Sequence, residues 1–157
     1  MKHLIVVLLI TFVLIGCDDS RVYEVNQEFD DRYWLSDSVQ HFTFTINDSL
    51  STYNIYYNLR NSVSYPFRNI YVQYNLKDST GNTLKTDLLN GQLFEEKTGK
   101  PLGEGLGDVF DHQFSIINEF QFPYAGTYEI DLNQYMRRDT LPEILAVGVR
   151  VEKSMKE

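Results

Sequence analysis

The strongest constraint on how this chain can fold is an alternation of apolar and polar residues that recurs along most of its length. The runs that show it are residues 42–47, 53–60, 70–77, 128–132 and 145–152. Successive side chains of a strand point to opposite faces of a sheet, so each run predicts a strand with one buried and one solvent-exposed face. Because the runs are rich in β-branched and aromatic residues, they predict an all-β fold, a two-sheet antiparallel β-sandwich of the immunoglobulin-like or jelly-roll-like kind.

The segments between these runs predict further strands, a turn and one long loop. Less regular apolar runs at 84–94 and 112–122 favour additional strands, and residues 78–82 carry a hairpin-turn signal. Residues 95–111 contain four glycines and predict a long loop across one end of the sandwich. Residues 140–144 are compatible with a single helical turn, and no segment shows sustained helical periodicity.

The start of the chain has the layout of a bacterial lipoprotein signal peptide. Two polar residues, Lys2 and His3, precede a largely apolar run over residues 4–15, which ends at Gly16 followed by Cys17. A charged start, a short apolar middle and a small residue at the cleavage point are typical of secretory signal peptides. The run is shorter than the roughly 20 apolar residues that a membrane-spanning helix needs. We therefore predict that the leader is removed and that the thiol of Cys17 receives acyl chains.

This leader divides the chain into three predicted segments. Residues 1–16 are the lipoprotein signal peptide, residues 17–31 are the lipidated N-terminus and an acidic tether that ends in a loosely held first strand, and residues 32–153 are the β-sandwich domain. Two or more acyl chains make a durable anchor, whereas one chain binds a membrane only marginally. We therefore predict that Cys17 holds the protein on a lipid bilayer of the cell envelope, outside the cytoplasm.

The charge balance and the cysteine content exclude several classes of function. The chain carries 22 Asp and Glu against 14 Lys and Arg, a net charge of −8, and loss of Lys2 with the leader makes the remainder more acidic. Nucleic-acid binding relies on clustered Lys and Arg, so no nucleic-acid partner is predicted. Cys17 is the only cysteine, and its acylation leaves no thiol for a disulfide or a thiolate metal site.

No group of residues in the sequence predicts catalysis, a cofactor or a metal. His41 and His112 would need carboxylate help to bind zinc, as a zinc site takes three or four ligands. Glu104, Asp108 and Asp111 could gather around calcium, but they lack the spacing of the twelve-residue calcium loop. The glycine-rich stretch around them lacks the strand–loop–helix context of a phosphate-binding loop, and no serine stands in a nucleophile-elbow motif. We therefore predict a protein that is not an enzyme and has no catalytic, metal-binding or cofactor-binding residues.

Four hydroxyl residues follow an aspartate and precede an aliphatic residue or a threonine. They are Ser38, Ser49, Ser79 and Thr140. This pattern resembles the O-glycosylation signal of exported Bacteroidetes proteins, and such glycans are bulky and lie on the surface. Asp-Ser and Asp-Thr pairs are also good turn formers, and all four fall between predicted strands. The four residues are therefore candidate O-glycosylation sites, with turn formation as the alternative explanation.

Two kinds of partner are compatible with the polar phase of the strands. Trp34, Tyr56 and Tyr71 lie on that phase or outside the clear strands, where flat aromatic rings bind sugars or enter protein interfaces. The pattern alone does not separate a glycan from a protein partner. The candidate contact residues are Asn54, Tyr56, Asn58, Arg60, Gln73 and Asn75, together with the predicted loop at 95–111.

Several long strings of the sequence resemble the GldH family of gliding-motility lipoproteins of Bacteroidetes. They lie at residues 32–34, 56–67, 100–112, 134–139, 141–142 and 147–152, and the similarity extends from Cys17 to about residue 153. The resemblance implies a lipoprotein needed for gliding, anchored in the outer membrane on its periplasmic face or at the cell surface. It implies other gliding-machinery lipoproteins and type IX secretion components as partners. Cys17 is the only functional residue that the family pattern transfers.

Together these observations predict a rigid β-sandwich on a lipid anchor that acts as a non-catalytic scaffold or interaction domain of the gliding machinery. The alternative is a lipid-anchored glycan-binding β-sandwich module of the cell envelope. In the scaffold interpretation the polar strand faces contact a protein, whereas in the glycan interpretation Tyr56 and Tyr71 stack on sugar rings.

Overall fold

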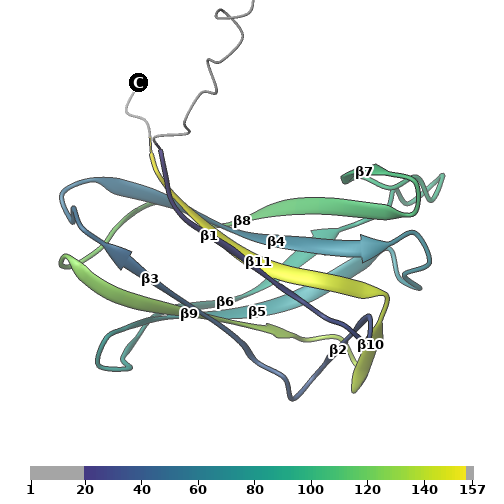
Figure 1. The fold of residues 1–157 in the computed structure, drawn as a ribbon, viewed down its shortest axis with the longest axis horizontal. Coiled ribbons are helices and arrows are strands. Elements are labelled where there is room, and N and C mark those ends of the chain that lie inside the picture. Colours follow the sequence, from purple (N-terminus) through teal and green to yellow (C-terminus); the bar gives the residue numbers. More distant parts are fainter. Residues whose placement is uncertain (1–19, 155–157) are drawn as a thin grey trace, which may run out of the picture.

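The computed structural model of the protein describes residues 20–154, and within that range it contains strands and no helix. The strands are β1 (Arg21–Glu28), β2 (Tyr33–Leu35), β3 (Gln40–Ile46), β4 (Thr52–Ser62), β5 (Asn69–Asp78), β6 (Thr83–Gln92), β7 (Glu104–Leu106), β8 (Val109–Gln121), β9 (Gly126–Gln134), β10 (Thr140–Pro142) and β11 (Ile144–Lys153). They form a five-stranded sheet in the order β1-β11-β4-β8-β7, a four-stranded sheet in the order β3-β9-β5-β6 and a ribbon of β2 and β10. Figure 1 shows the two sheets as stacked layers with the ribbon at one end. The predicted antiparallel β-sandwich is confirmed.

The alternating runs of the sequence all lie in strands, namely β3, β4, β5, β9 and β11. In β4 the inward residues Tyr53, Ile55, Tyr57 and Leu59 are at most 1% exposed, whereas the residues between them reach solvent. The less regular runs form β6 and most of β8. The polar phase of the pattern therefore covers the outer face of each sheet.

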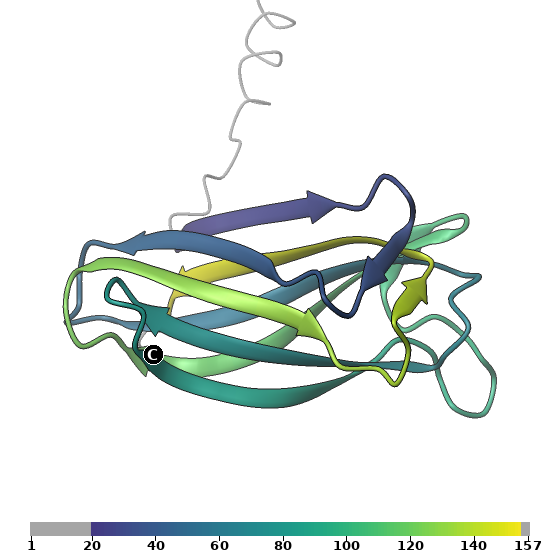
Figure 2. The same ribbon diagram turned by 90° about the horizontal axis from the view of Figure 1, so that it is seen from below.

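The described chain begins and ends at the same end of the sandwich. The backbone amide of Lys153 donates a hydrogen bond to the carbonyl oxygen of Ser20 at 2.8 Å. The hairpin of β7 and β8 lies at the opposite end of the molecule, as Figures 1 and 2 show. The long axis of the domain therefore separates the end that receives the N-terminal segment from the end that carries β7.

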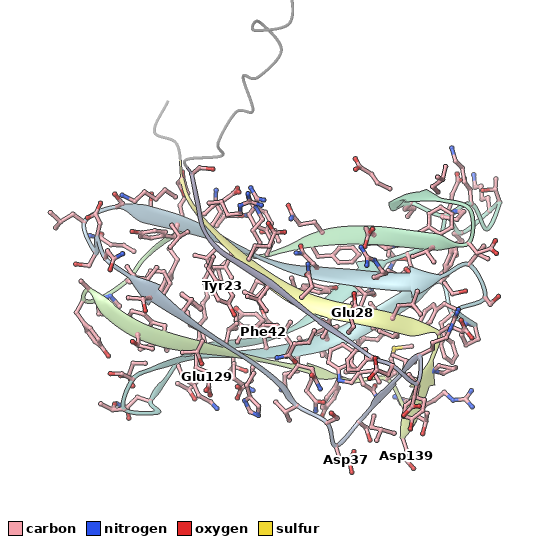
Figure 3. All side chains as sticks on the ribbon, viewed as in Figure 1. Tyr23, Glu28, Asp37, Phe42, Glu129 and Asp139 are labelled. Carbon is pink, nitrogen blue, oxygen red and sulfur yellow. The ribbon has the colours of Figure 1, made fainter. Side chains whose placement is uncertain are left out.

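Aromatic rings dominate the core between the two sheets. Phe122, which is 1% exposed, lies with its ring centroid 4.5 Å from that of Tyr128 and 5.5 Å from that of Tyr53. Phe44 belongs to the same cluster, at 5.9 Å from Phe122. These distances fall in the range of favourable tilted and edge-to-face ring pairs. Figure 3 shows the side chains that fill the space between the layers.

The N-terminal boundary of the folded domain lies earlier than predicted. The loosely held first strand that the sequence predicted within residues 17–31 is β1, which pairs with β11 as an edge strand of the five-stranded sheet. Tyr23 packs against the core with its ring 5.7 Å from that of Phe44, while Val25 is 42% exposed. The strand is thus half-buried, in agreement with its weak alternation, and it belongs to the folded domain.

Two short strands replace irregular structure that the sequence predicted. β7 lies inside the predicted loop at 95–111 and pairs with the start of β8. The helical turn considered at 140–144 is wrong, because residues 140–142 form β10 and pair with β2. Strands of three residues are too short to produce a readable alternation, so only their pairing partners reveal them.

Trp34, which the sequence offered as a surface aromatic residue, is fully buried. It lies in β2, and its ring stacks on that of Phe29 with the centroids 5.7 Å apart. Its indole Nε1 donates a hydrogen bond to the carbonyl oxygen of Ser38 at 2.8 Å, so the polar atom is satisfied as well. The pairing of β2 with β10 closes this end of the core.

The turn between β3 and β4 is organised by the carboxylate of Asp48. It accepts hydrogen bonds from the Ser51 hydroxyl at 2.6 Å, the Leu50 amide at 3.0 Å and the Lys153 ammonium at 3.0 Å. These three bonds, with that from Ser51 foremost, hold the pKa of Asp48 well below its ordinary value of 3.8. The charged carboxylate therefore ties the turn to the end of β11.

Acid should weaken this turn, because an unfolded chain protonates Asp48 at its ordinary pKa. The stabilisation is complete above about pH 5 and is lost as the pH falls through the lowered pKa of the folded state. We expect Asp48→Asn to be less stable than the natural protein by a constant amount above about pH 5, with the difference shrinking at lower pH. Urea unfolding from pH 2 to 8 measures this. A difference that stays constant down to pH 2 would contradict the role of the charge.

Candidate functional site: a polar furrow on the five-stranded sheet

Three rows of outward-facing residues cross the five-stranded sheet. Strand register aligns them as Glu24, Arg150, Tyr56 and Ser115 in the first row, Asn26, Gly148, Asn58 and Gln113 in the second, and Glu28, Ala146, Arg60 and Asp111 in the third. Neighbouring strands lie about 4.8 Å apart, so residues in register on one face contact each other across the sheet. Amides, carboxylates and guanidinium groups thus meet on one surface.

The middle of this surface is low because β11 presents small residues there. A Cβ atom on Gly148 would overlap Oδ1 of Asn26 and lie 2.5 Å from the carbonyl oxygen of Val25. The missing side chain lets Asn26 reach over β11, where its Oδ1 accepts a hydrogen bond from Nδ2 of Asn58 at 3.2 Å. Gln113 continues the chain by donating to Oδ1 of Asn58 at 3.1 Å. A row of bonded amides therefore connects β1 with β8.

Two adjoining hollows occupy this face, with volumes of about 570 and 490 Å³. They share Arg60 and Asp111, and we call them together the furrow. Its polar lining residues are Glu24, Asn26, Glu28, Asp30, Asn58, Arg60, Glu104, Asp111, His112 and Gln113. The lining comes from all five strands of the sheet, so the furrow runs across the strands rather than along them.

Ion pairs hold part of the lining in place. Nε of Arg60 donates to Asp111 at 2.8 Å, and this hydrogen bond raises the pKa of Arg60 above its ordinary value. Partial burial alone would raise the pKa of Glu24, but hydrogen bonds from Arg21 and Asn58 and the charge of Arg150 outweigh it, so the pKa of Glu24 is lowered. Glu24 is therefore charged at neutral pH.

His112 lies beneath the β7 end of the furrow. It faces inward from β8, is 8% exposed, and stacks on Phe114 with the ring centroids 5.7 Å apart. Burial lowers the pKa of His112, so the ring is neutral at pH 7. Its Nε2 atom has no hydrogen-bond partner among residues 20–154 and lies under Gly103, where a Cβ would approach it to 2.7 Å. His112 is therefore a buried packing residue at the edge of the furrow.

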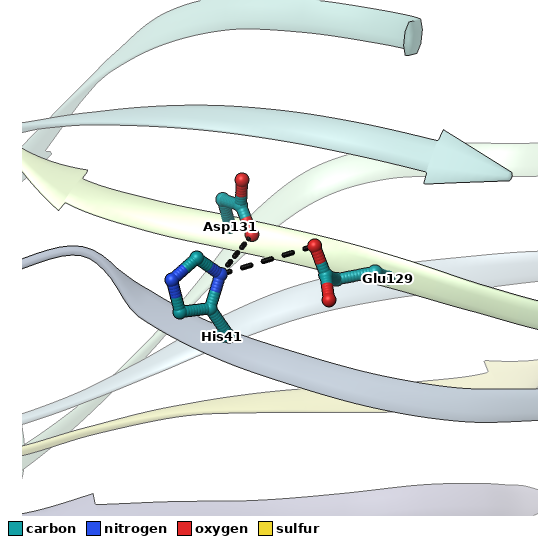
Figure 4. A group of neighbouring side chains, drawn as sticks. All are labelled: His41, Glu129 and Asp131. Carbon is teal, nitrogen blue, oxygen red and sulfur yellow. Dashed lines mark hydrogen bonds and ion pairs between the residues drawn. The ribbon is translucent and has the colours of Figure 1, made fainter. Parts of the chain in front are cut away.

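A second polar cluster lies on the outer face of the four-stranded sheet. Nδ1 of His41 is 2.6 Å from Oδ1 of Asp131 and 3.8 Å from Oε1 of Glu129 (Figure 4). Within residues 20–154 this is the one group of three His or carboxylate side chains close enough to share a metal ion. The ammonium of Lys77 already lies between the carboxylates, bonded to Asp131 and 3.5 Å from Glu129. A metal ion would have to displace this internal cation.

The candidate O-glycosylation sites lie at turns and at the β2–β10 ribbon. Ser79 and Thr140 are exposed, whereas Ser38 and Ser49 are partly buried. Two of the preceding aspartates stabilise their turns, because Asp48 and Asp78 accept hydrogen bonds from backbone amides of the same turn. Figure 3 shows the other two aspartates, Asp37 and Asp139, at the end where β2 and β10 pair. Turn formation therefore accounts for two of the four pairs, and glycosylation stays a prediction.

The residues that the sequence offered as one contact surface are divided between two faces. Asn54, Tyr56, Asn58 and Arg60 belong to β4 and the five-stranded sheet, whereas Gln73 and Asn75 belong to β5 and the opposite sheet. The two candidate sugar-stacking rings, Tyr56 and Tyr71, are separated in the same way. They cannot stack on one short glycan. Cys17 and the predicted leader lie outside the described residues.

Sequence reasoning identified Asn58 and Arg60 but missed Asn26, Gln113 and Gly148. A signal for the furrow was present in the run at 145–152, whose solvent-facing phase begins with Ala146 and Gly148. Two small residues in the polar phase of a strand indicate a depression in the solvent-facing surface of the sheet along that strand. The amides from β1 and β8 carried no comparable signal.

Filling the centre of the furrow should disturb both its shape and the sheet. We expect Gly148→Val to cost about 1–3 kcal/mol of unfolding free energy, as other overpacked positions do, because its side chain meets Asn26 and backbone atoms of β1. Urea denaturation measures the cost. Ser115→Val adds bulk at an exposed position on the same face and should change stability by less than about 0.5 kcal/mol. Equal effects of the two substitutions would contradict the close approach at Gly148.

The fold and the furrow define a small antiparallel β-sandwich with a polar furrow on the outer face of one sheet. The family model described as GldH lipoprotein matches residues 21–151, and the chain belongs to this family. Two relatives are 28% identical to the chain, each over 94% of both sequences: the gliding motility lipoprotein GldH of Flavobacterium johnsoniae and a GldH homolog of Christiangramia forsetii. No helix among residues 20–154 has the length and apolar character to cross a membrane.

Several solved structures match the chain at low similarity. The infectious bursal disease virus VP2 subviral particle matches 85% of this chain and 33% of its own with a TM-score of 0.45 and 16% identity. A two-domain esterase active on acetylated mannans matches 99% of this chain and 46% of its own, with a TM-score of 0.37 and 13% identity. The cleaved adhesin domain of Lys-gingipain from Porphyromonas gingivalis matches 85% of this chain and 84% of its own, with a TM-score of 0.37 and 8% identity.

Proposed function

We propose that the protein is a lipid-anchored component of the gliding-motility machinery and that its β-sandwich acts as a non-catalytic scaffold. The observation that carries the proposal is the family match over residues 21–151, together with gliding relatives that align over nearly the whole chain. The partners are other gliding-machinery lipoproteins and components of type IX secretion. The sandwich holds these partners at the membrane and does not transform them.

The attachment is made by acyl chains on Cys17 after removal of residues 1–16, in the outer membrane. The segment after the cysteine is short, because β1 already begins at Arg21. The anchored end of the sandwich thus stays near the headgroups, and the β7 end extends away from them. Protease treatment of intact cells distinguishes a domain at the cell surface, which is digested, from one on the periplasmic face, which is protected.

The chemistry of the furrow supports a binding role. It brings together amides, carboxylates and one guanidinium, groups that hold a partner by hydrogen bonds and charge. Covalent catalysis instead requires a nucleophile activated by an adjacent base. His112, the histidine nearest the furrow, is a neutral buried ring stacked on Phe114. The two phenylalanines that line the furrow, Phe29 and Phe114, are stacked on the core rings of Trp34 and Tyr57, so they offer no free platform for a sugar and a protein partner is favoured over a glycan.

Deletion and cross-linking in a gliding bacterium test this function. Loss of the gene should abolish colony spreading and cell gliding, and the full-length gene should restore both. Chemical cross-linking of an epitope-tagged copy in intact cells should capture a gliding lipoprotein or a secretion component. Normal gliding without the gene, or capture of neither class of partner from a functional tagged copy, would overturn the proposal.

A further inference from the structure

We propose that the furrow is the docking site for an extended, lysine- or arginine-bearing segment of a partner protein. The inference rests on the proposed function, since it names the surface and the charge class of the partner that the scaffold holds. Three features of the furrow carry it: its unbalanced charge, its free amide groups and its length across the sheet.

The charge of the furrow is strongly negative. Its lining contains the carboxylates of Glu24, Glu28, Asp30, Glu104 and Asp111 against one guanidinium, that of Arg60. Glu24 and Asp111 are paired with arginines, whereas the other three carboxylates lie beyond ion-pair distance of any basic side chain in the described part of the chain. A ligand that brings positive charge to Glu28, Asp30 and Glu104 therefore meets a complementary surface.

These carboxylates are spread out and do not form a metal site. Among residues 20–154, the group that could share one metal ion lies around His41 on the opposite sheet. Charges distributed along a furrow match charges distributed along a chain, such as alternate side chains of an extended peptide. No three of these acids within residues 20–154 are close enough to share a single divalent ion.

The floor of the furrow offers hydrogen-bonding groups that suit a peptide backbone. Asn26 and Gln113 lie at the two ends of the bonded amide row, and their Nδ2 and Oε1 atoms respectively make no hydrogen bond within residues 20–154. One is a donor and the other an acceptor, as are the N–H and C=O groups of a peptide unit. An extended segment can therefore pair with both ends of the row.

The length and the far end of the furrow fit a short segment. Five strands spaced about 4.8 Å apart span about 19 Å, which is roughly six residues of extended chain. At the β7 end Leu106 is 95% exposed and Leu102 is 55% exposed, and each lines one of the two hollows. Exposed leucines beside a polar furrow give an apolar contact for one side chain of the partner.

Peptide binding to the mature acylated protein in a non-ionic detergent tests the proposal. The probes are fluorescent ten-residue peptides with alternating Lys and Thr, or alternating Gln and Thr as the neutral counterpart. Fluorescence anisotropy should show binding of the Lys-Thr peptide at least tenfold tighter than that of the Gln-Thr peptide. Equal affinities, or no binding of the Lys-Thr peptide, would overturn the proposal.

Matched variants separate the furrow from the acidity of the whole protein. Glu28→Gln with Glu104→Gln removes two charges from the furrow, whereas Glu96→Gln with Asp87→Asn removes two exposed charges elsewhere. The furrow variant should weaken binding about tenfold and the control less than twofold, with both variants melting like the natural protein. Equal weakening by the furrow variant and the control would assign the effect to net charge and overturn the proposal that the furrow is the docking site. Cross-linking in cells does not depend on this result, so a gliding partner captured while the peptide fails would leave the proposed function standing.

Discussion

Replacing Phe122 with alanine is expected to lower the unfolding free energy by about 3–5 kcal/mol, the usual cost of removing a large buried aromatic side chain. The ring is 1% exposed, and its centroid lies 4.5–5.9 Å from those of four other rings: Phe44, Tyr53, Phe120 and Tyr128. Phe44 and Tyr128 belong to the four-stranded sheet, and Tyr53 and Phe120 belong to the five-stranded sheet. A cavity at Phe122 therefore removes contacts that hold the two sheets together. Truncation loses both the transfer of the ring from water and its contacts with the cluster.

Urea unfolding at pH 7 measures this cost. Tyr135→Ala is the matched control, because Tyr135 is 57% exposed and its loss should change stability by less than about 0.5 kcal/mol. Phe122→Leu keeps part of the volume and should fall between the two. A cost for Phe122→Ala below about 1.5 kcal/mol would show that the core collapses around the gap and that the cluster does not hold the sheets together.

Replacing Cys17 with serine is expected to abolish acylation and with it the lipid anchor of the mature protein. Serine has no thiol for the acyl chains, and each buried methylene of such a chain contributes about 0.8 kcal/mol to membrane binding. The described domain offers no spanning helix that could substitute for the anchor. We expect no incorporation of labelled fatty acid, recovery of the protein outside the membrane fraction or as uncleaved precursor, and loss of gliding.

Gly16→Ala provides the control for this experiment, since it changes the neighbouring residue but keeps a small side chain at the cleavage point. It should label with fatty acid and support gliding as the natural protein does. Fatty-acid labelling that persists in Cys17→Ser would place the modification elsewhere and refute the lipoprotein leader. Normal gliding without labelling would show that the anchor is dispensable.

Much of the architecture was predictable because strand patterning is a local property. The alternation at 53–60 predicted both the strand and its buried residues, and in β4 Tyr53, Ile55 and Tyr57 are all buried as expected. Short or weakly patterned elements were missed for the same reason. β2 and β10 contain three residues each, so nothing in their own sequence indicates that they pair and bury Trp34.

The furrow was only partly predictable. The polar phase of β4 identified Asn58 and Arg60 as outward residues, but it could not separate them from Gln73 and Asn75 on the other sheet. The neighbours of Asn58 are Asn26 and Gln113, which lie far from it along the chain. Only the strand order β1-β11-β4-β8 makes these three amides a row.

The alternating strands and the acidic balance can be read from the chain, and the lipoprotein leader can be predicted from it, because each depends on neighbouring residues or on composition alone. The division of polar residues between two faces, the burial of Trp34 and the furrow over Gly148 depend on which strands pair and in which register. Strand pairing brings together segments that lie far apart in the sequence, as β1 and β11 near the two ends of the described chain show. It is decided by the fit of whole sheets around a common core, a property that no single stretch of sequence contains.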